Sequence, residues 1–277
     1  MTYFQFLLIF LGIPLVLLSG ICLFQINISK KILPPSFQSW KPAGIIFGLV
    51  IVAIVWTTPW DNYLVATRVW WYDPDLVTGF VIGYVPVEEY TFFILQTTLT
   101  GMLTVCLIRQ WPTYMAPVNF QPNQTLIKWT SIVIAILWVI STIILLSGYP
   151  PAIYLTLILS WALIPIFIQM VFGADILWHY RRILFWGIVP ITLYLAIADS
   201  LAIRAGTWTI SEEKTLGIYI GPILPLEEFM FFLITNVLVV FGVTLLLAQA
   251  SHRRSATMPI LKNYVQASNA ETMQDDR

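Results

Sequence analysis

Seven long runs of apolar residues follow one another along the chain, and short polar segments separate them. Each run has roughly the 20 residues that an α-helix needs to cross a hydrocarbon core about 30 Å thick. The runs cover residues 3–24, 43–60, 84–108, 126–147, 151–172, 183–198 and 218–247. This pattern predicts an all-α integral membrane protein with seven transmembrane helices.

The two ends of the chain differ in character. No basic segment precedes the first run and no small-residue cleavage site follows it, whereas Lys30 and Lys31 come directly after it. We therefore expect a membrane span there and not a secretory signal. Residues 249–277 are polar and rich in Ser, Asn and Gln, so we expect a disordered tail.

Composition agrees with this class of protein. Hydrophobic residues make up 58% of the chain and charged residues 10%, and the mean hydropathy is +0.82. A soluble domain carries about 25% charged residues. The formal net charge is zero and no basic stripe occurs outside short loops, so we expect no nucleic-acid partner.

The basic residues are divided unequally between the two sets of alternate loops. Of the 14 lysines and arginines, only Arg68, Arg204 and Lys214 fall on the side that holds the N-terminus. Because cytoplasmic loops carry the excess of basic residues, we expect a cell-membrane protein with its N-terminus outside and its C-terminus in the cytoplasm. Most acidic residues fall on the outer side. The rule for membrane topology does not account for this bias, but a functional role of the acidic residues could.

The sequence contains two copies of one unit. Asp61 closes one apolar run and Trp70 follows nine residues later; Asp199 closes another run and Trp208 follows at the same distance. Each copy then continues into a Pro-x-Glu-Glu-x-x-Phe-Phe segment, which comprises residues 86–93 in the first copy and 225–232 in the second. The distance from the aspartate to the first glutamate is 27 residues in one copy and 28 in the other.

This repeat predicts the organisation of the chain. Each unit has three spans, and the fourth span restores parity, so both units run the same way through the membrane. We expect a first repeat at residues 1–110, a linker with the fourth helix at 111–150, a second repeat at 151–248, and a polar cytoplasmic tail at 249–277. Both acidic motifs then lie at the outer ends of their helices and face each other across a pseudo-twofold axis.

The carboxyl groups of the repeat are the candidate catalytic residues. Proline followed by glutamate also commonly stabilises the first turn of a helix, and this structural role could explain one copy of the motif. It explains less well two copies with aspartates at matched distances. Adjacent glutamates point about 100° apart on a helix, so we expect one of each pair to face the bundle. Arg68 or Arg204 could pair with the aspartates. The candidates are Glu88, Glu89, Glu227, Glu228, Asp61 and Asp199.

Such carboxyl groups suit acid–base chemistry on a hydrocarbon. A carboxyl group in an apolar site can stay protonated near neutral pH, and a second one beside it can take a proton back. Aromatic faces stabilise cations, although each ring alone could serve ordinary membrane packing. The candidates for cation stabilisation or substrate binding are Tyr90, Phe92, Phe93, Trp60, Trp70, Phe229, Phe231, Phe232 and Trp208. Together these residues suit protonation of an alkene, ring closure through a carbocation and loss of a proton.

No cofactor or metal ion is expected, since these steps need no redox group. Cys22 and Cys106 both lie within apolar runs and are not spaced as metal ligands. We interpret the two cysteines as small apolar residues.

In its motifs the sequence resembles the small membrane lycopene cyclases, which occur as heterodimeric subunit pairs or as fused two-unit chains. The resemblance extends over about residues 1–248 and rests on the two Pro-x-Glu-Glu segments, on residues 57–62 and on Asp199 with residues 206–208. It implies a fused-form isomerase, an intramolecular lyase with lycopene β-cyclase activity that converts lycopene through γ-carotene to β-carotene. It also implies that the four glutamates are catalytic. The implied partners are lycopene, the lipid bilayer and other enzymes of carotenoid biosynthesis.

Several alternatives stay open on the sequence alone. Both motifs lie in one leaflet, which favours one shared chamber that processes one end of the substrate per visit over two independent sites. A proton-coupled transporter would also place carboxyl groups in repeated helices. A hydratase, or a cyclase that acts on a C50 or monocyclic carotenoid, could use the same residues. A retinal protein is excluded, because no lysine lies well inside a span.

Overall fold

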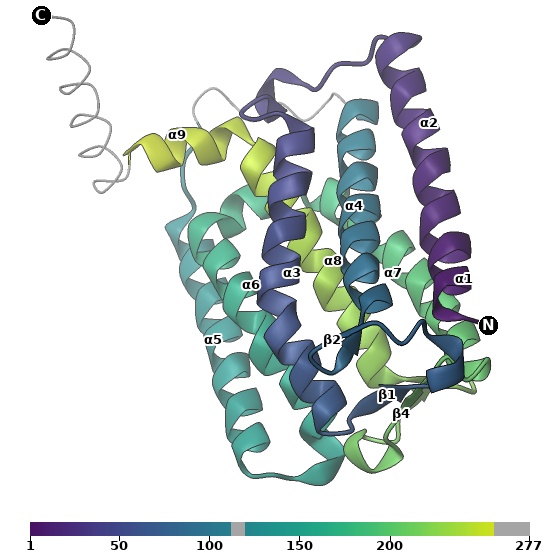
Figure 1. Ribbon diagram of the computed structural model, residues 1–277. Coiled ribbons are helices and arrows are strands. Elements are labelled where there is room, and N and C mark those ends of the chain that lie inside the picture. Colours follow the sequence, from purple (N-terminus) through teal and green to yellow (C-terminus); the bar gives the residue numbers. More distant parts are fainter. Residues whose placement is uncertain (112–119, 258–277) are drawn as a thin grey trace, which may run out of the picture.

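The computed structural model describes residues 1–111 and 120–257, and long helices make up most of this part of the chain (Figure 1). Seven helical segments in the described ranges are long and apolar enough to cross a membrane. They are the continuous α1 (Tyr3–Leu7), η1 (Leu8–Gly12) and α2 (Ile13–Asn27), then α3 (Pro42–Ala66), α4 (Val87–Gln110), α5 (Gln124–Leu146), α6 (Ile153–His179), α7 (Arg181–Arg204) and α8 (Leu226–Leu247). Short 3-10 turns precede α3 and α6, at Pro35–Phe37 (η2) and Pro150–Ala152 (η4). The prediction of an all-α protein with seven transmembrane helices is confirmed.

Short strands gather at the end of the bundle where α4 and α8 begin, which is also the end of the N-terminus (Figure 1). β1 (Trp70–Tyr72) pairs antiparallel with β4 (Trp208–Ile210), so this ribbon joins the two repeats. Its register puts Trp70 opposite Ile210 and Tyr72 opposite Trp208, as a twofold axis through the ribbon requires. The turns η3 (Pro74–Leu76) and η5 (Glu212–Lys214) follow the two strands.

A small hairpin precedes each acidic helix. β2 (Val81–Ile82) pairs with β3 (Val85–Pro86), and β5 (Tyr219–Ile220) pairs with β6 (Leu224–Pro225). The first hairpin turns through residues 83–84 and the second through residues 221–223, which accounts for the one-residue difference between the spacings of 27 and 28.

Four predicted span boundaries are wrong, two because of these hairpins and two because α3 and α7 are longer than expected. Residues 84–86 and 218–225 form hairpin backbone, and the helices begin only after the prolines, whose extended conformation and missing N–H suit a helix start. Asp61 and Asp199 do not end their helices, because α3 continues to Ala66 and α7 to Arg204. Each aspartate therefore lies about one turn inside its helix.

Polar contacts at the centre of the bundle join α4, α7 and α8. The Thr100 hydroxyl donates to Asn236 Oδ1 at 2.8 Å, and Asn236 Nδ2 donates to Thr192 Oγ1 at 3.1 Å. All three side chains are buried, so each hydrogen bond satisfies groups that have no access to water. By contrast α5 lies at the periphery, packs on α6 and exposes most of its surface.

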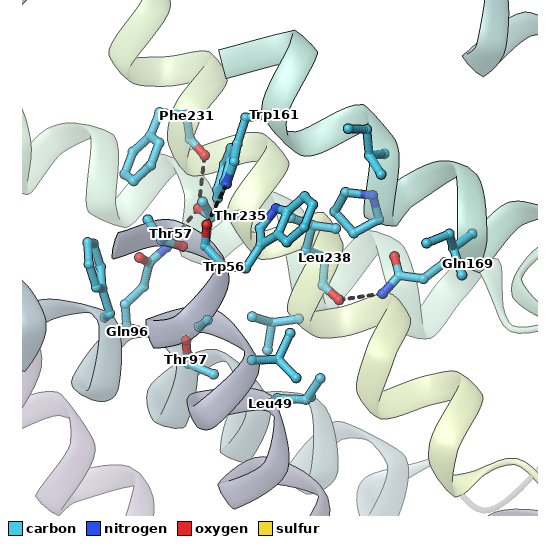
Figure 2. A pocket seen from close by; sticks show the side chains of 17 residues that line it. Leu49, Trp56, Thr57, Gln96, Thr97, Trp161, Gln169, Phe231, Thr235 and Leu238 are labelled. Carbon is cyan, nitrogen blue, oxygen red and sulfur yellow. Dashed lines mark hydrogen bonds between the residues drawn. The ribbon is translucent and has the colours of Figure 1, made fainter. Parts of the chain in front are cut away.

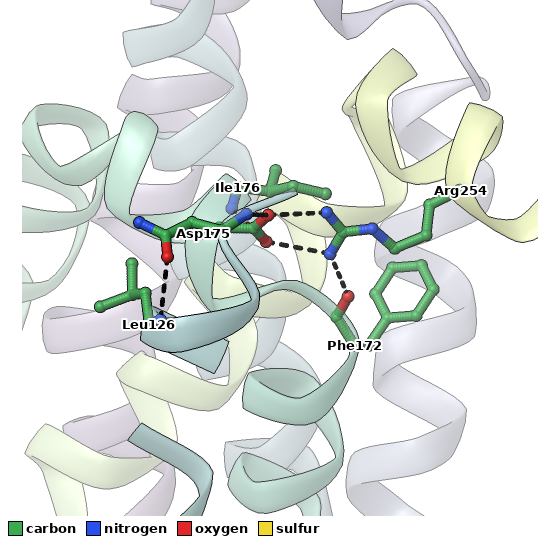
Figure 3. Close-up of polar contacts among 6 residues, drawn as sticks. Leu126, Phe172, Asp175, Ile176 and Arg254 are labelled. Carbon is green, nitrogen blue, oxygen red and sulfur yellow. Dashed lines mark hydrogen bonds and ion pairs between the residues drawn. The ribbon is translucent and has the colours of Figure 1, made fainter. Parts of the chain in front are cut away.

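The opposite end of the bundle carries one more helix, α9 (Gln249–Thr257), which corrects the expectation of a disordered tail from residue 249. Arg254 on α9 forms two hydrogen bonds with Asp175 on α6, of 2.9 and 2.8 Å (Figure 3). Asp175 also accepts the backbone N–H of Asn123 at the start of α5. This buried carboxylate thus fastens α9 to the bundle. The rest of the predicted tail, residues 258–277, lies outside the described residues.

The interpretation of the cysteines as small apolar residues is also wrong. Cys22 on α2 and Cys106 on α4 form a disulfide, with their Cα atoms 6.1 Å apart. The two residues are 84 positions apart in sequence, so nothing in the local pattern indicated the pair. The bond joins the first helix to α4 near the end of the bundle opposite the hairpins.

Candidate active site

A small cavity, which we call the acidic chamber, lies between the hairpin ends of the two repeats. Its volume is about 40 Å³, and each repeat contributes six of its lining residues. Five pairs of these residues occupy matching positions in the two repeats. The lining residues are Tyr3, Trp60, Asp61, Trp70, Glu89 and Phe92 from the first repeat, and Tyr154, Asp199, Trp208, Glu228, Phe231 and Phe232 from the second.

The second glutamate of each motif faces this chamber. Glu89 and Glu228 lie in the first turns of α4 and α8 and are almost fully buried. The phenol of Tyr3 donates to Glu89 Oε2, and the phenol of Tyr154 donates to Glu228 Oε1 at 2.6 Å. Each repeat thus builds its own tyrosine–glutamate pair and presents it to the common space.

The first glutamate of each motif lies behind the chamber and holds a loop. Glu88 accepts the backbone N–H of Thr78 at 2.7 Å, and Glu227 accepts that of Leu216 at the same distance. Both glutamates are fully buried. This arrangement agrees with the expectation that only one glutamate of each pair faces the bundle interior. The other glutamate fastens the loop before the hairpin to the helix.

The two aspartates also belong to the chamber. Asp61 and Asp199 are each about 1% exposed, and each interacts electrostatically with both Glu89 and Glu228. The indole of Trp208 donates to Asp199 Oδ1 at 3.0 Å. In the described part of the chain, Oδ2 of each aspartate has no hydrogen-bond partner, so it is free to carry or accept a proton.

Within the described ranges, no arginine forms an ion pair with these aspartates. Arg68 or Arg204 could have paired with them on the sequence alone, but neither does so. Arg68 lies over the ring of Trp71 instead, with its guanidinium carbon 6.0 Å from the ring centroid. The aspartates are buried beneath the hairpin loops, which a solvent-facing guanidinium does not reach. Because burying four unpaired negative charges together is costly, some of the four chamber carboxyl groups are expected to carry a proton.

The candidate aromatic residues divide into three groups. Trp60, Trp70, Phe92, Phe231, Phe232 and Trp208 line the acidic chamber. Phe93 is buried beside the chamber and lines a neighbouring cavity. Tyr90 and its counterpart Phe229 lie outside both linings.

Tyr90 has a structural part in the first hairpin. Its phenol donates to the Ile82 carbonyl at 3.0 Å and accepts a hydrogen bond from Asn62 Nδ2 at 3.3 Å. Asn62 Oδ1 in turn accepts the backbone N–H of Tyr84 at 2.7 Å. A Cβ atom on Gly83, whose φ is +70°, would lie 2.1 Å from that Oδ1, so the hairpin needs glycine there. These contacts fix β2 and β3 against α3.

The hydrogen bonds to the two chamber glutamates break the twofold symmetry of the site. The phenol of Tyr72 on β1 donates to Glu89 Oε2 at 3.1 Å, whereas the matching position on β4 is Ile210. Burial, and then the charge of Glu89, raise the pKa of the Tyr72 phenol well above its ordinary value, so this phenol keeps its proton. Glu89 therefore accepts two phenol hydrogen bonds and Glu228 accepts one.

Sequence reasoning missed the three tyrosines of the site. A tyrosine near the end of a membrane span is common, so Tyr3, Tyr72 and Tyr154 carried no local signal. The repeat did contain a signal for two of them: Tyr3 precedes Pro14 by 11 residues, and Tyr154 precedes Pro165 by the same number. Matched polar residues at matched distances would have identified this pair, but not Tyr72, which has no counterpart.

The arrangement can move protons within an apolar, aromatic enclosure. The carboxyl groups can donate and accept protons, and the aromatic faces around them can stabilise a transient cation. Among the described residues, no group of three or more His, Cys, Asp or Glu side chains is placed to hold a metal ion.

Comparisons with known proteins agree with this chemistry. The family model described as lycopene cyclase matches residues 1–107 and 151–246, which correspond to the two repeats. The lycopene beta-cyclase of Halobacterium salinarum (strain R1) is 32% identical over 251 residues, which cover 88% of this chain and 95% of that protein.

Fungal relatives are larger. The bifunctional lycopene cyclase/phytoene synthases of Arthroderma gypseum and Aspergillus oryzae are each 36% identical over 70% of this chain. The chain spans only about a third of their length. No solved structure matches the chain. The resemblance noted in the sequence motifs is confirmed by the family match and by the archaeal relative: the chain belongs to the lycopene cyclase family.

Proposed function

We propose that the protein is a lycopene β-cyclase that closes the ψ-ends of lycopene into β-rings, giving γ-carotene and then β-carotene. The observation that carries this proposal is the acidic chamber, in which buried carboxyl groups from both repeats meet inside one aromatic enclosure. The relatives named as lycopene cyclases support the choice of substrate. The chemistry is an isomerisation, so substrate and product have the same atoms.

The reaction needs one proton in and one proton out. A protonated carboxyl group gives its proton to the terminal double bond of the ψ-end, which leaves a tertiary cation. The next double bond attacks this cation, so a carbon–carbon bond closes a six-membered ring and the positive charge moves to a ring carbon. A carboxylate then removes a neighbouring proton, and a ring double bond forms. Trp60, Trp70, Phe92, Phe231 and Trp208 surround the cation with π-faces.

The broken symmetry suggests a division of roles between the two glutamates. Hydrogen bonds donated to a carboxylate favour its charged form. Glu89 has two phenol donors and Glu228 has one, so we assign Glu89 as the base and Glu228 as the acid. Asp61 and Asp199, which interact with both glutamates, return the proton from Glu89 to Glu228. Glu88 and Glu227 act as positioning residues that hold the loops.

We also propose that residues 1–110 and 151–248 act as two repeats that share one active site, with residues 111–150 as the linker and 249–277 as a cytoplasmic tail. A chamber with six residues from each repeat supports one common site over two independent ones. The partners are then the carotenoid, the lipid bilayer and other enzymes of carotenoid biosynthesis. No cofactor is required.

We place the chamber on the outer side of the cell membrane, with the N-terminus outside and the C-terminus inside. The bias of basic residues toward the opposite loops supports this orientation. In a bacterial host, a C-terminal green fluorescent protein should fluoresce, and a C-terminal alkaline phosphatase should be inactive, because phosphatase folds only outside the cytoplasm. An active phosphatase fusion would reverse the assignment.

The proposed reaction is tested by pigment analysis. In a host that accumulates lycopene, expression of the chain should replace lycopene by β-carotene, with γ-carotene present only transiently, as measured by chromatography. If the protein is well expressed and folded and the host still contains only lycopene, the assignment fails. A hydratase, or a cyclase for another carotenoid, would then be tested next, and a proton-coupled transporter after that.

A further inference from the structure

A second, larger cavity adjoins the acidic chamber. Its volume is about 300 Å³, and it lies among α3, α4, α6 and α8 (Figure 2). Its wall is mostly hydrocarbon and aromatic. Two glutamines reach it, but both use their N–H groups within the protein: Gln96 donates to Thr235 Oγ1 at 2.9 Å, and Gln169 donates to the Leu238 carbonyl at 3.0 Å. The cavity therefore suits an apolar ligand.

The cavity opens sideways between α3 and α6. Val52 and Trp56 on α3, and Ile164 and Ile168 on α6, line the cavity and are also exposed on the outside of the bundle. Both helices are long and apolar enough to cross a membrane, so this outer surface faces lipid chains. A hydrocarbon dissolved in the bilayer can thus reach the cavity without passing the headgroups.

Three nearly parallel aromatic rings separate this cavity from the acidic chamber. Trp161 lines the cavity and stacks on Trp60, which lines the chamber, with ring centroids 4.5 Å apart. Trp60 also lies parallel to Phe231, at 5.8 Å, and Phe231 lines both spaces. The indole of Trp60 donates to the Leu157 carbonyl at 3.1 Å, which holds it across the seam between α3 and α6. Flat rings in this arrangement match the flat face of a conjugated chain.

The volumes of the two cavities indicate that the substrate must occupy both of them. The chamber, at about 40 Å³, is too small to hold the whole of the substrate end. The larger cavity, at about 300 Å³, lies in the range of small-molecule sites. A substrate end in contact with the carboxyl groups must therefore extend into the larger cavity past the aromatic rings.

The matching seam in the other half of the bundle is built differently. By the repeat, α7 and the first helix correspond to α3 and α6, so Ala198 takes the place of Trp60 and Phe10 that of Trp161. Tyr194, which takes the place of Trp56, donates its phenol to the Phe10 carbonyl at 3.0 Å and so ties this seam together. The stacked rings of the α3–α6 seam are not repeated there.

From these features we propose that the cavity between α3 and α6 binds the polyene chain of a linear conjugated hydrocarbon, and that the substrate reaches the chamber through this seam alone. This inference rests on the proposed function. The segment next to the reacting end lies against Trp60, Trp161 and Phe231, and the rest of the chain extends into the lipid. After one ring has closed, the substrate must leave and return with its other end first.

A matched pair of variants tests the choice of seam. Ile168 at the mouth of the cavity and Leu17, its counterpart on α2, are exposed to a similar degree, 62% and 64%. Ile168→Trp should lower the rate of lycopene consumption on the order of tenfold by filling the mouth, and Leu17→Trp should leave the rate near that of the wild type. Equal rates in the two variants would overturn the single entrance.

A second pair tests binding without turnover. In a Glu228→Gln background, the protein purified from a lycopene-accumulating host should carry bound lycopene, measured by absorbance per mole of protein. Adding Ala53→Trp inside the cavity should lower bound lycopene about tenfold. Val55→Trp, on the same helix but outside the lining, should leave it unchanged. Undiminished lycopene in the Ala53→Trp protein would refute the site, even if the wild type cyclises lycopene normally. Failure of the wild type to cyclise lycopene would instead refute the proposed function.

Discussion

Glu89→Gln and Glu228→Gln should each abolish ring formation from lycopene. Both side chains face the acidic chamber, and loss of a general acid or base typically costs about 10²–10⁴-fold in rate. Glutamine has nearly the same shape and can still accept the phenol hydrogen bonds from Tyr3, Tyr72 or Tyr154, so the fold should persist. The rate of lycopene loss per folded protein in membranes, measured by chromatography, checks this result.

Glu88→Gln and Glu227→Gln are the matched controls. Their amide oxygens can still accept the N–H groups of Thr78 and Leu216, and these side chains do not line the chamber. We expect both controls to keep most of the wild-type rate once expression is corrected for. If all four variants were equally inactive, the distinction between chamber glutamates and loop glutamates would be wrong.

Tyr154→Phe should lower the rate of cyclisation by about 10–100-fold, because it removes the one phenol that stabilises the carboxylate formed when Glu228 gives up its proton. Hydrogen bonds to charged groups contribute about 1.5–3 kcal/mol, which sets this range. Tyr3→Phe should have a smaller effect, since Glu89 retains Tyr72, and Tyr72→Phe should likewise be partly compensated by Tyr3. The Tyr3→Phe/Tyr72→Phe double variant should lose more than the two single effects combined.

Tyr194→Phe serves as the control for these variants. It also removes one phenol hydrogen bond inside the membrane, but the acceptor is the Phe10 carbonyl and no carboxyl group is involved. We expect its initial cyclisation rate to stay within about threefold of the wild type. Wild-type rates in Tyr154→Phe, or a loss as large in Tyr194→Phe, would contradict a special role for the tyrosine–glutamate pairs.

Much of the architecture could be predicted from the sequence, because each membrane helix corresponds to a long apolar run. The two copies of the acidic motif also made the repeat recognisable. The same motifs predicted that the glutamates of each pair face different ways, since neighbouring residues on a helix point about 100° apart. They could not tell which glutamate faces the chamber. That choice depends on the loops that precede the hairpins, because backbone N–H groups of these loops donate hydrogen bonds to Glu88 and Glu227.

What the sequence did not reveal depends on contacts between distant segments. The disulfide of Cys22 and Cys106 joins helices that are far apart in the chain. Tyr72 donates to Glu89 from β1, which pairs with β4 of the other repeat. The two seams differ because single positions of the repeat carry different residues, such as Trp60 in the first repeat and Ala198 in the second. The structural effect of this difference can be seen only in the packed bundle.

The central claim is that the two repeats form one site, with an acid from one repeat and a base from the other. Analysis of the products of Glu89→Gln and Glu228→Gln during partial conversion of lycopene tests it most directly. A shared site predicts that each single variant leaves lycopene unchanged, with no accumulation of the monocyclic γ-carotene. Normal consumption of lycopene by either variant, with γ-carotene as its final product, would show that each repeat closes a ring independently and would contradict the account.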